Sequence, residues 1–245
     1  MAKIALVTGG SRGIGAATCR LLARDGWDVA VNYRSDAPAA EAVVAEVTAA
    51  GRKAIAVQGD VGNEADVIRL FETTERALGP VDGLVNSAGV IGPKGRVDAL
   101  TADAIEALLR TNVIGSIMTC REAVKRMSTK HGGKGGAIVN VSSGSAYIGN
   151  PGTGVLYAIS KGAVNSLHIG LSQEVGGEGI RVNAVSPGMT ATDMVTEEAI
   201  RKAMPNIPMG RAGEPEEIAE AIVWLLGDKA SYVAGANIRV AGGRP

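Results

Sequence analysis

Residues 3–15 read KIALVTGGSRGIG, a short apolar run that leads directly into a glycine-rich turn. The run Lys3–Thr8 has the length and composition of a strand that is buried on both faces of a parallel sheet. Gly9, Gly13 and Gly15 then open a helical pattern that ends at Gly26. Glycines at such a junction let the backbone approach a pyrophosphate, which the N-terminus of the helix attracts. The turn therefore predicts a dinucleotide site, although its Gly-x-x-x-Gly-x-Gly spacing would also suit an ordinary tight turn.

Strand patterns and helix patterns alternate along the rest of the chain. Strands are expected near 3–8, 28–33, 53–58, 82–86, 137–142, 180–185 and 237–240. Helices are expected at about 13–25, 37–50, 63–78, 101–129, 155–175 and 215–227. This repeated order predicts an α/β fold with a doubly wound parallel sheet of about seven strands and helices on both faces. No change in composition divides the chain, so residues 1–245 are expected to form a single dinucleotide-binding domain.

The composition excludes several classes of protein. Of the 245 residues 46% are hydrophobic, and 25 Lys and Arg balance 25 Asp and Glu, so no basic field would attract nucleic acid. No apolar run is long enough to cross a membrane, and no signal-peptide pattern is present, which predicts a cytoplasmic protein. Cys19 and Cys120 are expected to be small buried hydrophobes, and His131 and His168 lack the spacing of ligands. We therefore expect no metal site.

Tyr157-Ala-Ile-Ser-Lys161 places a phenol and an ammonium group one turn apart on one face of a predicted helix. The cation should favour the phenolate and lower the pKa of Tyr157 from its usual value of about 10. A phenol tuned in this way can protonate a carbonyl oxygen near neutral pH. On its own the pair would fit a Tyr on the core face of a helix with a Lys at the rim. Its occurrence together with the glycine turn favours the catalytic interpretation.

The motifs of the whole chain, taken in order, resemble those of the short-chain dehydrogenase/reductase family. They are Thr8–Gly15, Asp60-Val61, Asn86-Ser87-Ala88-Gly89, Asn112 in Asn-Val-x-Gly, Ser142-Ser143, Tyr157 with Lys161, Pro187-Gly188 with Thr192, and Val240-Ala241-Gly242-Gly243. Ser87 replaces the second Asn of the family's Asn-Asn-Ala-Gly motif. Among the members, the chain resembles 3-oxoacyl-(acyl carrier protein) reductases and bacterial glucose dehydrogenases. The resemblance implies an oxidoreductase that interconverts a carbonyl and an alcohol by hydride transfer.

The resemblance also implies a role for each matched residue. Tyr157 would be the general acid or base, and Lys161 would lower the pKa of Tyr157 and bind the nicotinamide ribose. Ser143 would hold the substrate oxygen, and Asn112 would anchor a water molecule next to the lysine. The cofactor would contact residues of the glycine turn, of the later strand ends and of the catalytic pair. These are Gly9, Ser11, Arg12, Gly13, Ile14, Gly15, Asn32, Tyr33, Arg34, Asp60, Val61, Asn86, Ala88, Gly89, Tyr157, Lys161, Pro187, Gly188, Thr190 and Thr192.

The identity of the substrate-binding serine stays open at this point. Tyr157 follows Ser143 by 14 residues, one more than in many family members, so Ser142 could supply the hydroxyl instead. Adjacent residues of a strand point to opposite faces, so only one of the two should reach the site. The extra residue is expected in the turn-rich segment 149–154, and we favour Ser143.

The choice of cofactor follows from the end of the second strand. Members that use NAD usually carry an acidic residue there, whereas this chain reads Asn32-Tyr33-Arg34. Arg34 and Arg12 of the glycine turn could together bind the 2′-phosphate of NADP, since guanidinium groups bind phosphate in a bidentate fashion. NADP(H) is therefore favoured over NAD(H), although either arginine could be ordinary surface charge.

The substrate is less well defined by the sequence. The long loop at about 190–209 is expected to be a substrate lid, and apolar walls are expected from Tyr147, Ile148, Met189, Met194 and Met204. An acyl carrier protein is acidic, and a basic docking patch could come from Lys125, Arg126, Lys130 and Lys134. Gln173 stands where carrier-binding reductases tend to have a basic residue, which counts against that reading. Reduction of a 3-oxoacyl thioester, oxidation of glucose or a polyol, and a dinucleotide-binding sensor without turnover remain as alternatives.

Family members usually pair through two long helices, which in this chain correspond to residues 101–129 and 155–175. The resemblance therefore implies a homo-oligomer, either a tetramer or a dimer. The apolar faces of these helices fit such pairing, but burial in the core would explain them equally well. The expected partners are this second copy and a small-molecule carbonyl or alcohol.

Overall fold

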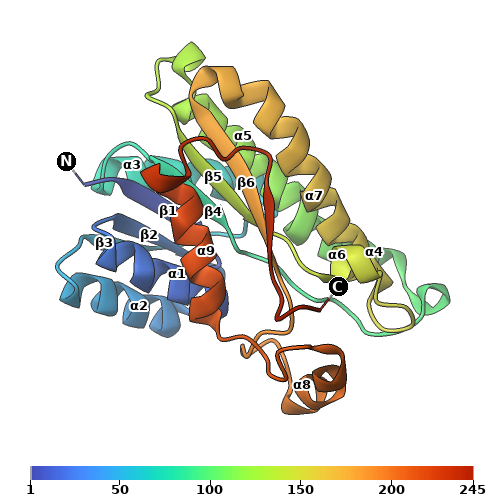
Figure 1. Cartoon of the computed structure of the whole chain (residues 1–245). Helices are drawn as coiled ribbons and strands as arrows, with labels where there is room; N and C mark the ends of the chain where they lie inside the picture. Colours follow the sequence, from blue (N-terminus) through green and yellow to red (C-terminus); the bar gives the residue numbers. More distant parts are fainter. Residues whose placement is uncertain (1, 245) are drawn as a thin grey trace.

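A parallel sheet forms the centre of the protein in the computed structural model, which describes residues 2–244 (Figure 1). Within this range the sheet has seven strands in the order β3-β2-β1-β4-β5-β6-β7, and every neighbouring pair is parallel. The strands are β1 (Ile4–Thr8), β2 (Asp28–Tyr33), β3 (Ala54–Gln58), β4 (Gly83–Asn86), β5 (Gly136–Val141), β6 (Ile180–Pro187) and β7 (Asn237–Val240). The doubly wound α/β sheet predicted from the sequence is confirmed.

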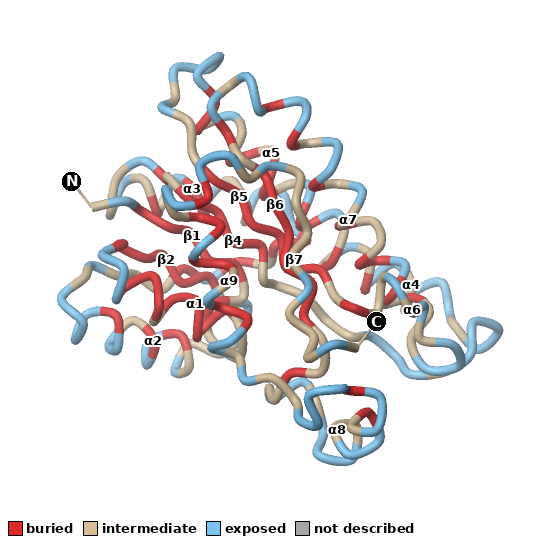
Figure 2. The backbone as a smooth tube through the Cα atoms, viewed as in Figure 1, coloured by how far each residue is buried: buried red, intermediate tan, exposed pale blue. Residues whose placement is uncertain are grey.

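Helices cover both faces of the sheet, and the side chains of each strand alternate between them. In β1, Ala5 and Val7 belong to one buried cluster and Leu6 to another, as the two-residue period of a strand requires. The first cluster includes side chains of α1 (Gly13–Arg24), α2 (Ala37–Ala49) and α9 (Pro215–Leu226). The second includes side chains of α3 (Glu64–Ala77), α5 (Gly115–Met127) and α7 (Val155–Val175). Figure 2 shows the central strands of the sheet buried between these two layers.

The strand order reverses between β1 and β4, and this reversal positions the site. After β3 the chain returns past β1 to form β4, so the loops that follow β1 and β4 diverge at the carboxyl ends of neighbouring strands. Open α/β sheets bind their ligands in the crevice at such a point. Thr8 connects the two loops, because its Oγ1 accepts hydrogen bonds from the backbone N–H groups of Ser87 at 3.1 Å and Ala88 at 3.2 Å.

The helix expected over 101–129 is instead interrupted by a short π-helical segment. It consists of α4 (Ala102–Leu109), a π-helical turn (Arg110–Ile114) and α5. The turn contains Asn112, whose amide group forms hydrogen bonds with the backbone of Val90. Single π-helical turns within α-helices are frequent at functional sites, and this one brings the helix against the loop that follows β4.

Two further helices were not expected from the sequence. The four-residue helix α6 (Ser145–Ile148) follows β5, and α8 (Glu197–Ala203) lies in the segment expected to be a loop lid. In α8, the Thr196 side chain accepts a hydrogen bond from the backbone N–H of Ala199. Its first turn is acidic and its last turn basic, which suits the helix dipole. Figure 1 shows α8 projecting away from the main body beyond the carboxyl ends of the strands.

Candidate active site

A cleft of about 840 Å³ runs along the carboxyl ends of the strands. Its walls come from the glycine turn after β1, the loops after β2, β3 and β4, the segment from β5 to α7, and the loop and helix α8 after β6. Nearly all residues predicted for the cofactor site line it: Gly9, Ser11, Arg12, Gly13, Ile14, Asn32, Tyr33, Arg34, Asp60, Val61, Ala88, Gly89, Tyr157, Lys161, Pro187, Gly188, Thr190 and Thr192. Motifs far apart in the sequence therefore share one cavity.

The glycine turn lies so close to its neighbours that side chains would not fit. Gly9 has a φ of +61°, and a Cβ atom there would lie 2.8 Å from the Cα of Ala88. A Cβ atom on Gly15 would clash with the carbonyl oxygen of Gly9. These two glycines keep the turn thin, so its outer side, with Ser11 and Gly13, opens to the cleft at the N-terminus of α1. Exposed N–H groups at a helix N-terminus suit a pyrophosphate.

The corner beside β2 contains the two arginines predicted to recognise a 2′-phosphate. Both Arg12 and Arg34 line the cleft, and Arg34 is exposed without an ion pair to any carboxylate in residues 2–244. Asn32 also lines this corner, but its side chain is buried and occupied by protein partners. Its Oδ1 accepts from the N–H of Gly9 at 3.3 Å, and its Nδ2 donates to the carbonyl of Gly59 at 3.0 Å. Asn32 thus holds the glycine turn against the end of β3.

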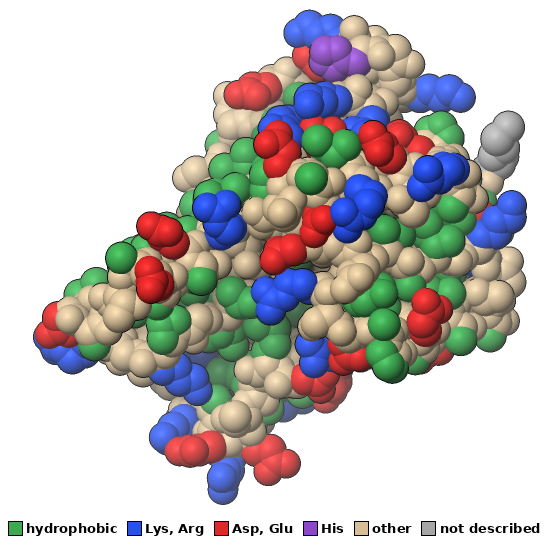
Figure 3. All heavy atoms as spheres, turned by 180° about the vertical axis from the view of Figure 1, so that it is seen from behind, with side chains coloured by type: hydrophobic (Ala, Val, Ile, Leu, Met, Phe, Trp, Pro, Cys, Tyr) green, Lys and Arg blue, Asp and Glu red, His purple; other side chains and the backbone are tan. Residues whose placement is uncertain are grey.

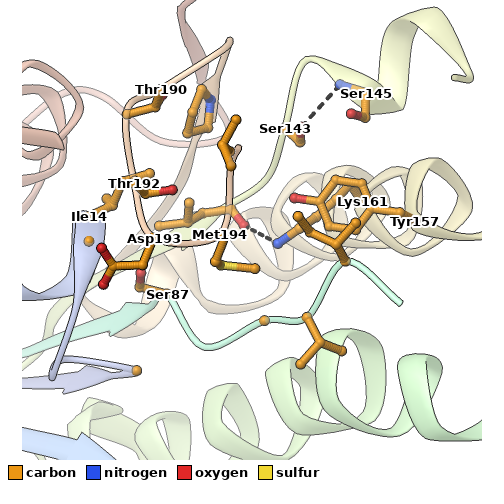
Figure 4. A pocket seen from close by; sticks show the side chains of 18 of the residues that line it. Ile14, Ser87, Ser143, Ser145, Tyr157, Lys161, Thr190, Thr192, Asp193 and Met194 are labelled. Carbon is orange, nitrogen blue, oxygen red and sulfur yellow. Dashed lines mark hydrogen bonds between the residues drawn. The ribbon is translucent and has the colours of Figure 1, made fainter. Parts of the chain in front are cut away.

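Ser143, Tyr157 and Lys161 converge on another wall of the same cleft. Figure 4 shows the phenol oxygen of Tyr157 directed toward Ser143, with the Lys161 side chain beside the ring. The Lys161 ammonium donates to the carbonyl of Val141 at 2.8 Å and lies 5.7 Å from the centre of the Tyr157 ring. The Ser143 hydroxyl accepts from the N–H of Ser145 at 3.1 Å, which fixes it at the end of β5. The site therefore contains two hydroxyl groups, those of Ser143 and Tyr157, next to the buried ammonium group of Lys161.

The hydrogen bonds of Ser142 distinguish the two candidate serines. The Ser142 hydroxyl is buried, and it lies 2.6 Å from Oδ1 of Asn165 and 3.1 Å from the carbonyl oxygen of Lys161. It therefore ties the end of β5 to the catalytic stretch of α7 and is occupied by protein acceptors. Ser143, by contrast, lies beside the phenol of Tyr157 in the cleft and helps to hold down its pKa. The structure supports Ser143 as the serine that faces the reacting groups.

The pKa of Tyr157 differs from expectation. It lies above its ordinary value because burial of the phenol disfavours the phenolate, and hydrogen bonding with Ser143 opposes the rise only in part. Burial also lowers the pKa of Lys161 to about 8. The expectation that Lys161 lowers the pKa of Tyr157 is wrong for this structure, because the ammonium is directed at the Val141 carbonyl instead of the phenol oxygen.

Three predicted site residues lie outside the cleft. Gly15 is packed behind the glycine turn, and Asn86 is buried below the loop after β4. The Asn86 side chain donates to Oδ1 of Asn140 at 2.9 Å and accepts from the hydroxyl of Thr119 at 2.7 Å, so it cross-links β4, β5 and α5. The sequence cannot distinguish a residue that supports the fold, such as Asn86, from one that contacts a ligand, because the motif places both kinds of residue side by side.

Asn112 is the third predicted site residue that does not line the cleft. Its Oδ1 accepts from the N–H of Val90 at 2.8 Å, while its Nδ2 donates to the carbonyl of Val90 at 2.9 Å and to the Ser160 hydroxyl at 3.1 Å. A Cβ atom on Gly89 would lie 3.5 Å from the Asn112 Oδ1 and 3.6 Å from the Lys161 Nζ, so both groups flank the same glycine. Asn112 therefore fixes the loop after β4 beside the lysine.

The substrate end of the cleft is only partly as expected. Ile148, Met189 and Met194 line it, but Tyr147 and Met204 do not. Tyr147 points outward, where its hydroxyl accepts a hydrogen bond from Asn237 at 3.1 Å. Polar residues that the sequence analysis did not single out also line the cleft: Asp36, Lys94, Asn150, Thr153, Asp193, Glu198, Lys202, Asn206 and Arg244. Of these, Asp36 carried a sequence signal, because an Asp before Ala-Pro is a typical start of a helix.

Comparison with known proteins places the chain in a family. The profile of the family described as "Enoyl-(Acyl carrier protein) reductase" matches residues 9–244. The chain belongs to the short-chain dehydrogenase/reductase family. It is 51% identical to the "Uncharacterized oxidoreductase YgfF" of Escherichia coli, over 98% of this chain and 99% of that protein. It is 39% identical to a "3-oxoacyl-[acyl-carrier-protein] reductase" of a Synechocystis species, over 99% and 96% of the two chains.

A solved structure of another short-chain dehydrogenase/reductase shows the same fold. A short chain dehydrogenase from Burkholderia cenocepacia in complex with NADP superimposes with a TM-score of 0.91 and 37% identity, over 98% of this chain and 97% of that one. Membership of this family makes the protein an oxidoreductase. Within residues 2–244 no helix is long and apolar enough to span a bilayer, and no group of three His, Cys, Asp or Glu side chains could hold a metal ion.

The lowered pKa of Lys161 in this short-chain dehydrogenase/reductase predicts a pH-dependent stability. The unfolded chain has the ordinary Lys pKa of 10.5, so between pH 8 and 10.5 it binds more protons than the folded chain, and stability rises with pH. Replacing Lys161 with Met removes this dependence. Urea unfolding measures the free energy of unfolding of both proteins. The value for the wild type minus the value for Lys161→Met should rise by about 2 kcal/mol between pH 7 and 9.5.

The two proteins share every other titrating group, so the contributions of these groups cancel in the difference. Among them are the buried Cys19 and Cys120, whose pKa values are raised by burial. A stability difference that does not change with pH would show that the Lys161 ammonium is not desolvated in the folded protein.

Proposed function

We propose that the protein is an NADP(H)-dependent oxidoreductase that interconverts a carbonyl and an alcohol by hydride transfer, with Tyr157 as general acid and base. The observation that carries the proposal is the convergence of Ser143, Tyr157 and Lys161 on the cleft into which the glycine turn also opens. A binding protein without turnover would not need a hydroxyl pair backed by a desolvated ammonium. This disfavours the sensor alternative.

The residues along the cleft fit a nicotinamide dinucleotide, which would supply or accept the hydride. The glycine turn packs closely against its neighbours because Gly9 and Gly15 have no Cβ atoms. This close packing leaves room for a pyrophosphate at the N-terminus of α1. Asp60, Val61 and Ala88 would hold the adenosine side, and Lys161 the nicotinamide ribose. Thr190, Thr192 and the rest of segment 190–209 would form a lid, since Thr192 already lies against Gly13.

The chain's own residues would move one proton during the reaction. The raised pKa of Tyr157 keeps its phenol protonated at neutral pH, which is the form that can donate to a carbonyl oxygen during reduction. Ser143 would hold the same oxygen and stabilise the charge that develops on it. Lys161 is mostly charged at pH 7, and its ammonium would act on the cofactor side by holding the nicotinamide ribose. In oxidation the phenolate of Tyr157 would take the proton of the alcohol, and Asn112 would keep the neighbouring loop in place.

The corner beside β2 supports NADP(H) as the preferred cofactor. Arg12 and Arg34 both face the cleft there, and β2 ends at Tyr33 without an acidic side chain. Guanidinium groups bind phosphate strongly because their hydrogen bonds are charge-assisted and can be bidentate. The Burkholderia relative, crystallised with NADP, adds support from a protein of the same fold.

The structure does not favour an acyl carrier protein as the partner. The basic residues considered as a docking patch lie near the C-terminus of α5 and the start of β5, at the amino ends of the strands, whereas the cleft lies at their carboxyl ends. Three of the four also have acidic partners, since Lys125 and Arg126 pair with Glu122, and Lys130 pairs with Glu178. Figure 3 shows acidic and basic side chains interspersed on this side of the molecule. A small carbonyl compound or a free thioester is the better candidate.

A homo-oligomer is proposed on the evidence of one helical face. A shallow groove between α5 and α7 is lined by apolar side chains, and Ile117 and Ile169 on these helices are about half exposed. Association of two copies over this face would remove that apolar surface from water. We retain a tetramer or dimer, in the cytoplasm, as the working arrangement.

The proposed activity can be tested with the purified protein by following the loss of NADPH absorbance. The panel should contain ketones, aldehydes and 3-oxoacyl thioesters, and also anionic carbonyl compounds because Lys94 and Arg244 line the cleft. The reverse reaction should be tried with NADP and with glucose and other polyols. Turnover of a carbonyl compound would support the proposal. Tight cofactor binding without turnover of any compound would favour the sensor alternative.

A further inference from the structure

Asp36 is an acidic residue in the same corner as the two arginines, and its sequence signal is that of a helix start and not of a cofactor site. It lines the cleft together with Arg12 and Arg34. Its carboxylate lies 3.9 Å from the guanidinium of Arg12, and both side chains are partly exposed. Within the described residues, Arg34 has no such counter-charge. The corner therefore holds two cations and one anion.

The position of the Asp36 side chain is fixed by helix α2. Asp36 is the residue at the N-cap of that helix, and its Oδ1 accepts a hydrogen bond from the N–H of Ala39 at 3.1 Å. A carboxylate at this place interacts favourably with the positive end of the helix dipole, and the cap keeps it oriented toward the corner. Because one carboxylate oxygen caps the helix and the other faces Arg12, the charge cannot swing freely away.

The same carboxylate has opposite effects on the two nicotinamide cofactors. A 2′-phosphate brought to Arg12 and Arg34 would carry close to two negative charges and would be repelled by Asp36, which also competes for Arg12. A ribose with a free 2′-hydroxyl carries no charge and could donate a hydrogen bond to a carboxylate. Asp36 therefore weakens the binding of the phosphorylated cofactor alone.

We infer that Asp36 is a specificity-determining residue that weakens the preference for NADP(H) and allows NAD(H) to bind as well. The inference rests on the proposed use of a nicotinamide dinucleotide, but it adds a residue that acts against the two arginines. In this view the selectivity of the protein is the balance of three side chains. The absence of an acid at the end of β2 is then only part of the explanation.

Asp36→Asn is the test variant, because Asn caps helices as well as Asp does and has nearly the same volume. Kd values for NADPH and NADH should be measured by titrating the free protein and following nicotinamide fluorescence, so no substrate is needed. We expect the Kd for NADPH to fall about five-fold and the Kd for NADH to stay unchanged or rise slightly. The effect on NADPH should shrink at high salt, since the charges are exposed.

Glu41→Gln is the matched control. Glu41 lies on the same helix, is exposed and does not line the cleft, so this variant changes the net charge equally without touching the corner. Its two Kd values should equal those of the wild type. In an Arg12→Gln background, Asp36→Asn should still tighten NADPH binding, but by less than in the wild type, because release of Arg12 no longer contributes.

The outcomes separate this inference from the proposed function. If the wild type binds neither nucleotide, the proposed function itself fails. If it binds NADPH but Asp36→Asn behaves like Glu41→Gln, Asp36 has no role in selectivity and the inference is overturned. Equal tightening of NADPH and NADH would also overturn it, because the effect would then concern the shared pyrophosphate. Urea unfolding should show Asp36→Asn to be as stable as the wild type, since the cap is preserved.

Discussion

Replacing Tyr157 with Phe is expected to lower turnover by about 1000-fold while changing the Kd for NADPH by less than about two-fold. The substitution removes one oxygen and leaves the aromatic ring, which keeps its packing and its position near the Lys161 ammonium. Because the phenol is the group proposed to protonate an oxygen held by Ser143, the variant lacks the proton donor. Single-turnover rates and fluorescence titrations on the same preparation would measure both quantities.

Tyr232→Phe provides the matched control for this experiment. Tyr232 is fully exposed and lies outside the cleft, so the same chemical change there should leave the rate and the cofactor affinity as in the wild type. A Tyr157→Phe protein that keeps more than about a tenth of the wild-type rate would contradict the general acid assignment, because a positioned acid typically contributes 100-fold or more.

The second large effect is expected for Arg34→Asp. The change removes a cation that could bind a 2′-phosphate and puts an anion in its place, so attraction becomes repulsion. We expect the ratio of kcat/KM with NADPH to kcat/KM with NADH to fall about 100-fold, almost entirely through weaker use of NADPH. Arg34 is exposed and has no ion pair in the described chain, so the substitution should not change the stability of the fold.

A charge reversal elsewhere controls for the change in net charge. Lys229 is exposed and lies between α9 and β7, outside the cleft. Lys229→Asp should leave the cofactor ratio unchanged. An Arg34→Asp protein whose NADPH to NADH ratio equals that of the wild type would exclude this corner from cofactor selection.

The fold could be predicted from the sequence because its signals are local. Buried parallel strands are short apolar runs, and each predicted strand lies within about two residues of the observed one, a deviation that is usual for element boundaries. The interruption of the helix over 101–129 could not be predicted, because the π-helical turn depends on hydrogen bonds between Asn112 and Val90, 22 residues apart. Helix α8 was missed because it is short and lies in a segment rich in Met and Thr.

The candidate site, like the fold, could be predicted only in part from the sequence. Motif order located Ser143, Tyr157, Lys161 and the two arginines, but it could not give the direction of the pKa shift of Tyr157. That shift depends on burial and on where the Lys161 ammonium points, both of which arise from packing. The contact between Arg12 and Asp36 likewise joins two loops, one after β1 and one after β2, whose distance the sequence does not contain.

A crystal structure of the protein with NADP and an alcohol turned over in the panel would test the central claim most directly. We predict that the hydroxyl groups of Tyr157 and Ser143 both lie within about 2.6–3.2 Å of the alcohol oxygen, with the carbinol carbon facing C4 of the nicotinamide. An alcohol oxygen bound by other groups, with the Tyr157 hydroxyl directed away from C4, would contradict the account.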